Sequence, residues 1–391
     1  MVEERPSNHV LHIAPELNFV RNFILPIIVQ SESHRSCSDV LCGVSDYVSS
    51  DRENKLNAEM PPQSNLYTRD IKLRSNPYKF ILTMIFMLRL IKKKQYNIIV
   101  CHTSIDSFAP ILLIRFFTKS RIVYFNHGVP ALGYTGLVRW FLQLIEKSNL
   151  TLSHKALSVG ASMQAELNGF ASFPKVALIA PGSACGIIPL ATNLDVLDSM
   201  RLKARAQLRF KPDDRIALFV GRPVARKGFF DVLRAWQTVQ RENFKLLLVG
   251  PSSDELAVAG LGLLNVEAVG YVEDTSLYYL AADVLCIPSY HEGFGYCYLE
   301  AAAAGCVPIC SSIPGPTDFI TDKQTGLCVP VGNVDAIAAT LEQILENDIF
   351  RERLRVAAFD MSKTFERGQI VEKMTHFFET EILLSQHRGK S

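Results

Sequence analysis

The sequence predicts an α/β protein with two open parallel sheets. The chain has 391 residues, more than one domain usually holds, so its length favours two or three domains. Its 48% apolar content is too high for a disordered chain. Short β-branched runs alternate with amphipathic segments along the sequence, which is typical of parallel strands joined by crossover helices.

The first half predicts six strands separated by helices or loops. Residues 51–76, rich in Asn, Ser and Pro, predict an irregular connection. A low-charge stretch after the sixth strand, residues 187–197, predicts a hinge to a second domain. The strands are expected at residues 10–14, 39–44, 96–102, 121–127, 155–160 and 175–180.

Two helices of the first half have a clear apolar pattern. Residues 78–94 predict an amphipathic helix closed by three lysines. It is an ordinary crossover helix, with its C-terminal dipole matched by the lysines, a helix that contacts an anionic membrane, or both, and we expect electrostatic binding to anionic lipid here. In residues 137–150 the apolar spacing predicts one buried face, formed by Leu137, Trp140, Phe141, Leu144 and Ile145.

The second half repeats the rhythm and predicts a second sheet. We expect an N-terminal domain at residues 1–188, a C-terminal domain at residues 189–369, and a final helix and tail at residues 370–391. The strands of the second sheet are expected at residues 216–221, 245–250, 266–272, 284–289 and 307–312.

The two halves differ in charge. Residues 1–190 carry 20 basic and 13 acidic side chains, whereas residues 191–391 carry 21 and 26. The excess is concentrated in residues 69–147, with 13 basic and three acidic side chains. A basic N-terminal half predicts contact with something anionic, such as a phosphate or a membrane surface. We expect no nucleic-acid partner.

Cysteine usage and hydropathy bear on the compartment. The nine cysteines lie in apolar runs, without the spacing of a zinc site or a disulfide framework. The N-terminus lacks the basic and apolar regions of a signal peptide, and no apolar stretch reaches the roughly 18 residues of a spanning helix. We therefore expect a cytoplasmic protein whose membrane contact, if it has one, is peripheral.

The first motif is the loop at residues 221–228, Gly-Arg-Pro-Val-Ala-Arg-Lys-Gly, which directly follows a predicted strand. In open α/β sheets, ligands bind at the carboxyl ends of the strands. The two glycines allow a close backbone approach, and Arg222 and Lys227 can neutralise a diphosphate at the start of the helix expected at residues 229–237. A solvated surface turn is the alternative for such a loop.

The second motif occupies residues 289–305, where a strand end is followed by Gly-Phe-Gly and an alanine-rich helix former. The Gly-Phe-Gly turn offers free amides at the start of the helix. Glu292 lies in the turn and Glu300 lies more than one turn into the helix, so both carboxylates can border one ligand. Ribose hydroxyls would suit Glu300, and a plain exposed carboxylate is the alternative.

The third motif is Asn126-His127-Gly128, a polar tip at the end of a first-half strand. A single histidine at a strand end is more commonly structural than catalytic. Gly128 keeps the backbone open to a ligand, which favours a functional role for His127.

Together these motifs resemble the family-4 glycosyltransferases of the GT-B fold, in particular members that build bacterial surface polysaccharides. Glu292 and Glu300, with Gly-Phe-Gly between them, look like the family's E-x7-E signature. The loop at residues 221–228 is similar to its G-R-x4-K-G, and residues 282–289 resemble its A-D-v-x-v-x-P-S. The resemblance implies two Rossmann-like domains with a deep cleft between them and a C-terminal helix that crosses back to the N-terminal domain.

The resemblance also implies roles for single residues. Arg222 and Lys227 would hold the diphosphate of a nucleotide sugar, and Glu300 would hold the ribose. The amides of Phe294 and Gly295 would hold the donor sugar together with Glu292. The resemblance also implies that His127 and Glu292 are the catalytic pair and that Tyr271 and Val272 border the base. On the acceptor side it implies Asn126, Gly128 and Asn18. One departure is the segment at residues 14–19, which replaces the glycine-rich loop of many members.

The activity implied is transfer with retention, without a metal or other cofactor, from a donor expected to be UDP-linked. The acceptor would be oligosaccharide or linked to a polyprenyl diphosphate, at the inner face of the cytoplasmic membrane. A nucleotide-sugar isomerase or hydrolase on the same scaffold is the alternative, because a fold does not determine a function. A non-catalytic nucleotide-sugar-binding protein is a third hypothesis.

Overall fold

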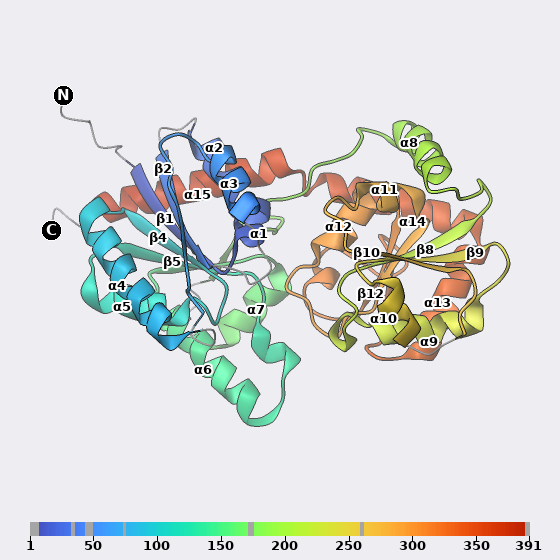
Figure 1. Cartoon of the computed structure of the whole chain (residues 1–391), viewed down its shortest axis with the longest axis horizontal. Coiled ribbons are helices and arrows are strands. Elements are labelled where there is room, and N and C mark those ends of the chain that lie inside the picture. Colours follow the sequence, from blue (N-terminus) through green and yellow to red (C-terminus); the bar gives the residue numbers. More distant parts are fainter. Residues whose placement is uncertain are drawn as a thin grey trace. The chain divides into compact units, whose positions relative to one another are not determined.

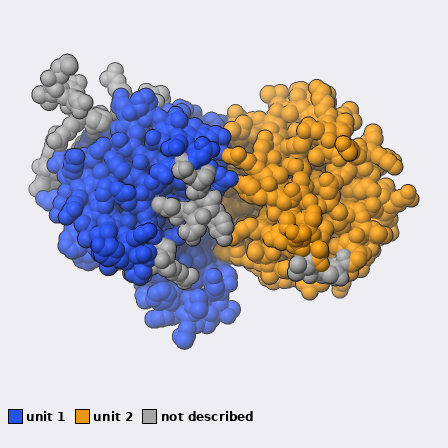
Figure 2. Space-filling model, viewed as in Figure 1, with its two compact units in different colours: residues 1–186, 367–391 blue, residues 187–366 orange. Residues whose placement is uncertain are grey.

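The computed structural model describes residues 8–32, 36–43, 50–72, 76–170, 176–258 and 262–387. The chain forms two compact units, which Figure 2 colours separately. Unit 1 comprises residues 1–186 and 367–391, and unit 2 comprises residues 187–366. The chain passes from unit 1 to unit 2 after residue 186, at the start of residues 187–197, for which the sequence predicts a hinge.

Unit 1 is built on a sheet of seven parallel strands in the order β3-β2-β1-β4-β5-β6-β7 (Figure 1). The central strands β1 and β4 are in register from Val10 opposite Ile98 to Ile13 opposite Cys101. Every residue of β4 is buried, as expected for a parallel strand covered on both faces. The strands are β1 (Asn8–Ala14), β2 (Ser36–Gly43), β3 (Leu66–Arg69), β4 (Ile98–His102), β5 (Arg121–Asn126), β6 (Lys155–Ser158) and β7 (Val176–Leu178).

Helices cover both faces of this sheet. On one face, α4 to α7 form a core with Leu11, Ile13 and Ile99. On the other face, α1 to α3 form a core with Ala14 and Val40. The helices are α1 (Leu17–Phe19), continued by a π-helical turn (Val20–Ile24), α2 (Leu25–Glu32), α3 (Ser50–Glu59), α4 (Pro77–Lys94), α5 (Phe108–Phe117), a 3-10 turn (Pro130–Gly133), α6 (Gly136–Leu152) and α7 (Ala161–Phe170).

The last helix, α15 (Arg367–His387), belongs to unit 1 although all of unit 2 precedes it in sequence. It packs against α2 and β4, where Phe378 and Ile382 are buried. The Nε of Arg121 in β5 donates to Oε2 of Glu381 at 2.5 Å. The C-terminal helix that returns to the N-terminal domain is therefore confirmed.

Unit 2 has a second parallel sheet, of six strands in the order β10-β9-β8-β11-β12-β13. Its strands are β8 (Arg215–Val220), β9 (Phe244–Val249), β10 (Val266–Gly270), β11 (Val284–Ile287), β12 (Val307–Ser311) and β13 (Leu327–Val329). Its helices are α8 (Leu194–Gln207), a 3-10 turn (Ala225–Lys227), α9 (Phe229–Val239), α10 (Ser253–Val258), α11 (Ser276–Ala281), α12 (Tyr296–Ala303), a 3-10 turn (Pro316–Asp318), α13 (Val334–Glu346) and α14 (Asp348–Lys363).

Each sheet has one place where the strand order reverses. In unit 1 it lies between β1 and β4, and in unit 2 between β8 and β11. The loops after such a pair of strands leave the sheet on opposite sides, which opens a crevice at the carboxyl ends. The loop at residues 221–228 follows β8, and the segment from Ser289 follows β11. The two second-half motifs therefore meet at the switch point of unit 2.

Asp283, from the segment that resembles A-D-v-x-v-x-P-S, has a structural role in unit 2. It is buried, and its Oδ2 accepts from Nη2 of Arg205 at 2.8 Å and from the amide of Ile216 at 2.7 Å. Burial alone would raise the pKa of Asp283, but Arg201 and Arg205 hold that pKa below its usual range. This carboxylate ties α8 to the edge of β8.

Residues 51–76 are not the irregular connection that the sequence predicts. They contain most of α3 and the whole of β3, which pairs with β2. The strand has only four residues and lies at the edge of the sheet, where none of them is fully buried. It was not predicted because an edge strand of this kind has no apolar run in its sequence. Its position is set by Asp39, whose Oδ1 accepts from the amide and Nδ2 of Asn65 at 2.9 and 2.8 Å. The strand β13 was not predicted either, because it has only three residues.

The buried face predicted for residues 137–150 is wrong for most of its members. The helix α6 forms, but Leu137 is 85% exposed, Trp140 62% and Phe141 57%, and Leu144 is exposed as well. Only Ile145 of the five is buried. The buried residues of α6 begin at Leu142, and every residue before it in the helix is exposed. Helical spacing shows that a face is apolar, but not what covers it.

Two further expectations concern the whole chain. The nine cysteines are free thiols, and seven of them are buried. Among the described residues, no helix is both long enough and apolar enough to span a bilayer.

Candidate active site

The two loops at the switch point of unit 2 approach each other closely at Gly228. This residue has φ +70°, and a Cβ placed on it would lie 2.3 Å from the carbonyl oxygen of Pro288. A side chain would therefore push the loop after β8 away from the segment after β11. Gly228 is also the residue before α9, so the basic loop ends directly at a helix N-terminus.

Across this contact, Lys227 and Glu292 form an ion pair. Nζ of Lys227 lies 2.6 Å from Oε1 of Glu292, and the two side chains are 18% and 8% exposed. The Oγ of Ser289 donates to the same carboxylate oxygen at 2.7 Å. The structure thus brings together a predicted phosphate-binding cation and a predicted sugar-binding carboxylate, and each holds the other in place.

The other cations of the loop differ in what they contact. Arg226 donates from Nη1 to the carbonyl of His291 at 3.1 Å, so it holds the two loops together. Arg222 is exposed, and its guanidinium has no hydrogen bond or ion pair with any described residue. Arg222 is therefore accessible to solvent, and its role in anion binding stays a prediction, whereas Arg226 makes a structural contact that the sequence did not predict.

The start of α12 offers backbone donors next to this pair. Gly295 precedes the helix with φ +90°, and a Cβ there would lie 2.7 Å from Cδ2 of Tyr298. Among the described residues, the amides of Phe294 and Gly295 have no backbone acceptor. The ring of Phe294 is buried against Phe319 and Phe365, so its side chain anchors the turn while its amide stays available. Helix N-terminal amides of this kind favour negative charge.

The remaining predicted donor residues lie around the same edge of the sheet. Glu300 is exposed on α12, and its Oε2 accepts from the hydroxyl of Tyr279 at 3.3 Å. Tyr271 follows β10 and is 71% exposed, and Val272 beside it is half-buried. Cys297 lies between the two glutamates, and burial raises the pKa of its thiol to about 12, which disfavours the thiolate.

In unit 1, His127 is the last member of a chain of three histidines. Nδ1 of His12 lies 3.0 Å from Nε2 of His102, and Nδ1 of His102 lies 3.1 Å from Nε2 of His127. The three residues come from β1, the end of β4 and the end of β5, so the chain crosses the switch point of the first sheet. His12 and His102 were not predicted as site residues, although both stand in predicted strands.

This histidine chain has two hydrogen-bond directions. A neutral imidazole carries one N–H, so His102 can donate to one neighbour only and must accept from the other. In one direction all three rings are protonated at Nδ1, and in the other all three are protonated at Nε2. The Nδ1 of His127, which lies outside the chain, is a donor in the first arrangement and an acceptor in the second.

Burial keeps the chain neutral. It lowers the pKa of His12 and of His127 to about 3 and places that of His102 well below its usual range. The rings of Phe19 and Phe23 lie 4.7 and 6.0 Å from that of His127 and enclose it. At neutral pH, His127 is thus a hydrogen-bonding group or a base, not a cation.

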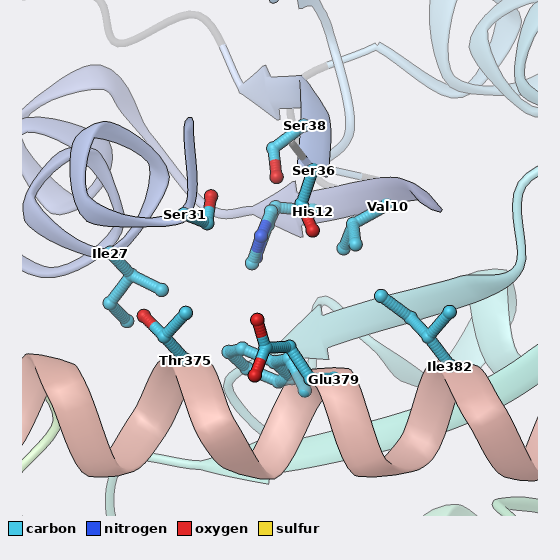
Figure 3. A pocket seen from close by; sticks show the side chains of 10 residues that line it. Val10, His12, Ile27, Ser31, Ser36, Ser38, Thr375, Glu379 and Ile382 are labelled. Carbon is cyan, nitrogen blue, oxygen red and sulfur yellow. The ribbon is translucent and has the colours of Figure 1, made fainter. Parts of the chain in front are cut away.

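The inner end of the chain reaches a small cavity beneath α15, lined by apolar and polar side chains and with room for about one water molecule. Figure 3 shows the His12 ring directed towards α15, with Thr375 and Glu379 on the facing wall. The Oγ1 of Thr375 is buried without a hydrogen-bond partner among the described residues. His12 and Thr375 are thus polar side chains on facing walls of this cavity.

The three residues predicted on the acceptor side differ in accessibility. Asn126 is fully buried, accepts from the amide of Gly128 at 2.9 Å and donates to the hydroxyl of Tyr124 at 2.9 Å. It holds the turn that presents His127. Gly128 is half-buried, and Asn18 is exposed on α1.

One group in the described residues has the spacing of metal ligands: His9, Cys37 and Asp39. Asp39 accepts from the hydroxyl of Tyr96 at 2.6 Å and lies 3.4 Å from Nζ of Lys94. A lysine beside the carboxylate fits a buried structural anion rather than a cation site. The group also lies towards the amino ends of β1 and β2, away from the histidine chain's outer end.

Unit 2 contains the part of the chain that is similar to a known family. Residues 200–361 match the family model described as glycosyl transferases group 1. The uncharacterized glycosyltransferase MJ1607 of Methanocaldococcus jannaschii is 32% identical over 176 residues, 43% of this chain and 45% of that protein. The capsular polysaccharide biosynthesis glycosyltransferase CapM of Staphylococcus aureus is 25% identical over 253 residues, 62% of this chain and 66% of that protein. The chain thus spans between 45% and 66% of the length of these relatives.

A solved structure covers the chain more fully. HepE of Anabaena, in complex with UDP and glucose, has a TM-score of 0.74 at 14% identity, over 95% of this chain and 100% of that chain. At this identity the likeness shows the fold alone, and it confirms the predicted GT-B architecture of two parallel-sheet domains. The matched range contains both switch-point loops of unit 2. Residues 200–361, which make up most of unit 2, are therefore similar to the glycosyl transferases group 1 family.

Proposed function

We propose that this chain is a glycosyltransferase that moves a sugar from a nucleotide diphosphate sugar, with UDP as the expected nucleotide, to a lipid-linked or oligosaccharide acceptor in surface polysaccharide biosynthesis. The observation that carries the proposal is the Lys227–Glu292 pair at the switch point of unit 2. It joins a cation suited to a diphosphate with a carboxylate suited to sugar hydroxyls, inside the matched family range.

The donor would lie along the carboxyl edge of the second sheet. Lys227 and Arg222 would face its diphosphate, and the amides of Phe294 and Gly295 would face the sugar together with Glu292. Glu300 would hold the ribose, and Tyr271 would border the base. Arg222 supports this arrangement because it is exposed and has no ion pair within the described residues. HepE was solved with UDP and glucose, which supports UDP as the first nucleotide to test.

In the proposed reaction, the bond between the anomeric carbon and the diphosphate oxygen breaks, and the acceptor oxygen bonds to that carbon on the same face. The acceptor proton passes to the departing phosphate oxygen, so the products are the glycosylated acceptor and the nucleoside diphosphate. Lys227, Arg222 and the helix N-terminus would stabilise the charge that develops on the leaving group. These groups could serve where other transferases use a metal ion, and we propose metal-independent transfer with retention on that basis.

His127 would contact the sugar or the acceptor through its outer nitrogen, Nδ1. Because the histidine chain is neutral, this atom can donate to or accept from a hydroxyl group but does not carry a full positive charge. Asn126 and Gly128 would position the ring. CapM, a relative over 62% of this chain, is named for capsular polysaccharide biosynthesis, which supports the proposed acceptor class.

Calorimetry against UDP-, GDP- and ADP-sugars tests the donor site. Wild-type protein should bind one nucleotide series, and Lys227→Ala and Glu300→Ala should each weaken binding by about tenfold or more, because each leaves polar groups of the ligand unpaired. Lys203→Ala is the matched control, since Lys203 is exposed on α8 outside the site. Equal binding by all three variants and the wild type would contradict the site.

Product analysis tests the reaction. With the preferred donor and a polyprenyl-diphosphate-linked or oligosaccharide acceptor, the sugar should appear on the acceptor and the anomeric configuration should be retained. Turnover of the donor with no acceptor present, at the same rate, would instead support the isomerase or hydrolase. Chelating agents should leave the rate unchanged if transfer is metal-independent.

A further inference from the structure

The buried part of α6 carries one carboxyl group, that of Glu146. The other buried side chains of this helix are apolar, except for that of Asn149. Glu146 is fully buried, and among the described residues no cationic side chain lies within ion-pair distance of it. An ionised carboxyl group in such a place is costly unless it accepts hydrogen bonds. The donors around Glu146 therefore decide what this carboxyl group does.

Two donors face the carboxyl group of Glu146, and both come from β5. The hydroxyl of Tyr124 donates to Oε2 at 2.8 Å, and Nδ2 of Asn126 donates to Oε1 over a longer 3.4 Å. The same Nδ2 donates its other proton to the hydroxyl oxygen of Tyr124 at 2.9 Å. When Glu146 is ionised, each N–H and O–H of this group thus has an acceptor.

The group holds the side-chain amide of Asn126 in one orientation. Its Oδ1 accepts from the backbone amide of Gly128 at 2.9 Å, two residues further along the chain. This contact is an Asx turn, in which a side-chain oxygen takes the place of a backbone acceptor. His127 is the middle residue of the turn, so the placement of its ring depends on which way the Asn126 amide faces.

The two ends of the Asn126 amide have opposite requirements. Gly128 offers a donor, so Oδ1 must face the turn and Nδ2 must face Tyr124 and Glu146. A carboxylate accepts at both of its oxygens and suits this arrangement. The change Glu146→Gln does not suit it in either orientation. The new N–H group would face either Nδ2 of Asn126 or the hydroxyl of Tyr124, and each of these is itself a donor there.

We propose that Glu146 is a positioning residue for sugar transfer: through Tyr124 and Asn126 it holds the Asx turn that presents His127. Because Glu146 is fully buried, it acts through Asn126 and does not itself contact a ligand. The inference rests on the proposed function for its purpose. Displacement of a catalytic group by about 1 Å can cost about 100-fold in rate, so loss of the turn should lower kcat. A tie between α6 and β5 with no part in the reaction is the alternative.

The first test measures the turn itself. Glu146→Leu removes both acceptors, and Glu146→Gln, which keeps one, is the second variant in case the first does not fold. Amide hydrogen exchange of Gly128, followed by NMR with isotope-labelled glycine, should be at least about tenfold faster in Glu146→Leu than in the wild type and intermediate in Glu146→Gln. Burial raises the pKa of Glu146 to about 7, so the measurements are made at about pH 8, where the carboxyl group is ionised.

Kinetics separate a positioning role from a structural one. In Glu146→Leu, kcat should fall at least about tenfold, whereas the Kd of the donor should stay within about twofold of the wild type, because the predicted donor residues lie in unit 2. Glu381→Gln is the matched control, since it breaks the buried pair of Glu381 with Arg121 at the opposite end of β5. Five residues of strand, about 17 Å, separate Arg121 from Asn126, so this control should lower stability but keep kcat.

Three results would overturn the inference: unchanged exchange of Gly128 in the variants that fold, unchanged kcat in those variants, or a loss of kcat that Glu381→Gln reproduces at equal loss of stability. The exchange is measured without donor or acceptor, so it does not depend on the proposed function. If wild-type protein transferred no sugar, the proposed function would fail, whereas faster exchange in the variants would still show that Glu146 holds the turn.

Discussion

Replacing Lys227 with methionine removes the cation of the switch-point pair and keeps much of the side-chain length. Glu292 would then retain only Ser289 of its two closest partners, at 2.7 Å, while its side chain stays 8% exposed. Removal of one partner of a buried pair costs about 3–5 kcal/mol. Lys227 is 18% exposed, so water can partly replace it, and we expect about 2–3 kcal/mol.

The double variant Lys227→Met/Glu292→Gln separates the pair from other effects. Glutamine keeps the shape of Glu292 without its charge, so the double variant should recover most of the loss, with a coupling free energy of about 2 kcal/mol. For a unit of this size, the single variant should melt about 5–10 °C below the wild type.

The assay is urea unfolding without nucleotide, followed by tryptophan fluorescence in a Trp140→Phe background. Trp236 is then the sole tryptophan, and because it is buried in unit 2 it reports the unfolding of that unit. A coupling free energy below about 0.5 kcal/mol would refute the reasoning, since distant independent sites give no more than that. Nucleotide binding, measured separately, should be lost in both variants that lack Lys227.

Three further predictions follow from the geometry. Gly228→Ala should lower the melting temperature of unit 2 and weaken nucleotide binding, because its Cβ would lie 2.3 Å from a backbone oxygen. Gly262→Ala is the control and should have neither effect, because no atom lies within 4 Å of the Cβ position there. Equal melting temperatures of the two variants would contradict the close approach at Gly228. Burial lowers the pKa of His12 to about 3 from 6.5, so the unfolded chain binds more protons below pH 6.5 and stability should fall as the pH drops from there towards 3. At pH 5 this histidine alone should cost about 2 kcal/mol relative to pH 7.5, and His12→Gln should remove that part of the pH dependence in urea titrations; an unchanged dependence would contradict it. His102→Phe should lower kcat with little change in the KM for the donor. It should also change the tautomer of His127, which nitrogen NMR of the ring detects, because His127 loses its hydrogen-bond partner. An unchanged His127 spectrum would show that the two rings are not coupled.

The motifs that follow strands were the most predictable part of the candidate site. The loop at residues 221–228 and the turn containing Glu292 each come directly after an apolar strand, and parallel strands deliver their carboxyl ends to one edge. Their chemistry could therefore be inferred without knowing the strand order. The direct contact between Lys227 and Glu292 could not be inferred from the sequence. The two residues are 65 positions apart, and only the pairing of β8 with β11 brings them together.

The histidine chain illustrates the opposite case. His127 was identified by its own neighbours in sequence, whereas His12 and His102 stand in predicted strands and look like ordinary strand residues. They form a chain because β4 lies between β1 and β5, an order that local sequence does not encode. Strand order is a property of the whole sheet, decided by the packing of all its crossover helices.

The sequence by itself determined the fold class, the alternation of strands and helices, the C-terminal helix, and the residue types at the strand ends. These depend on local periodicity and on side-chain chemistry, which a single chain displays directly. Only the tertiary structure decided which face of a helix is covered. Leu137, Trp140 and Phe141 have the spacing of a core face, yet they are exposed and precede Leu142, the first buried residue of α6. Burial depends on what lies opposite a residue, and that partner comes from elsewhere in the chain.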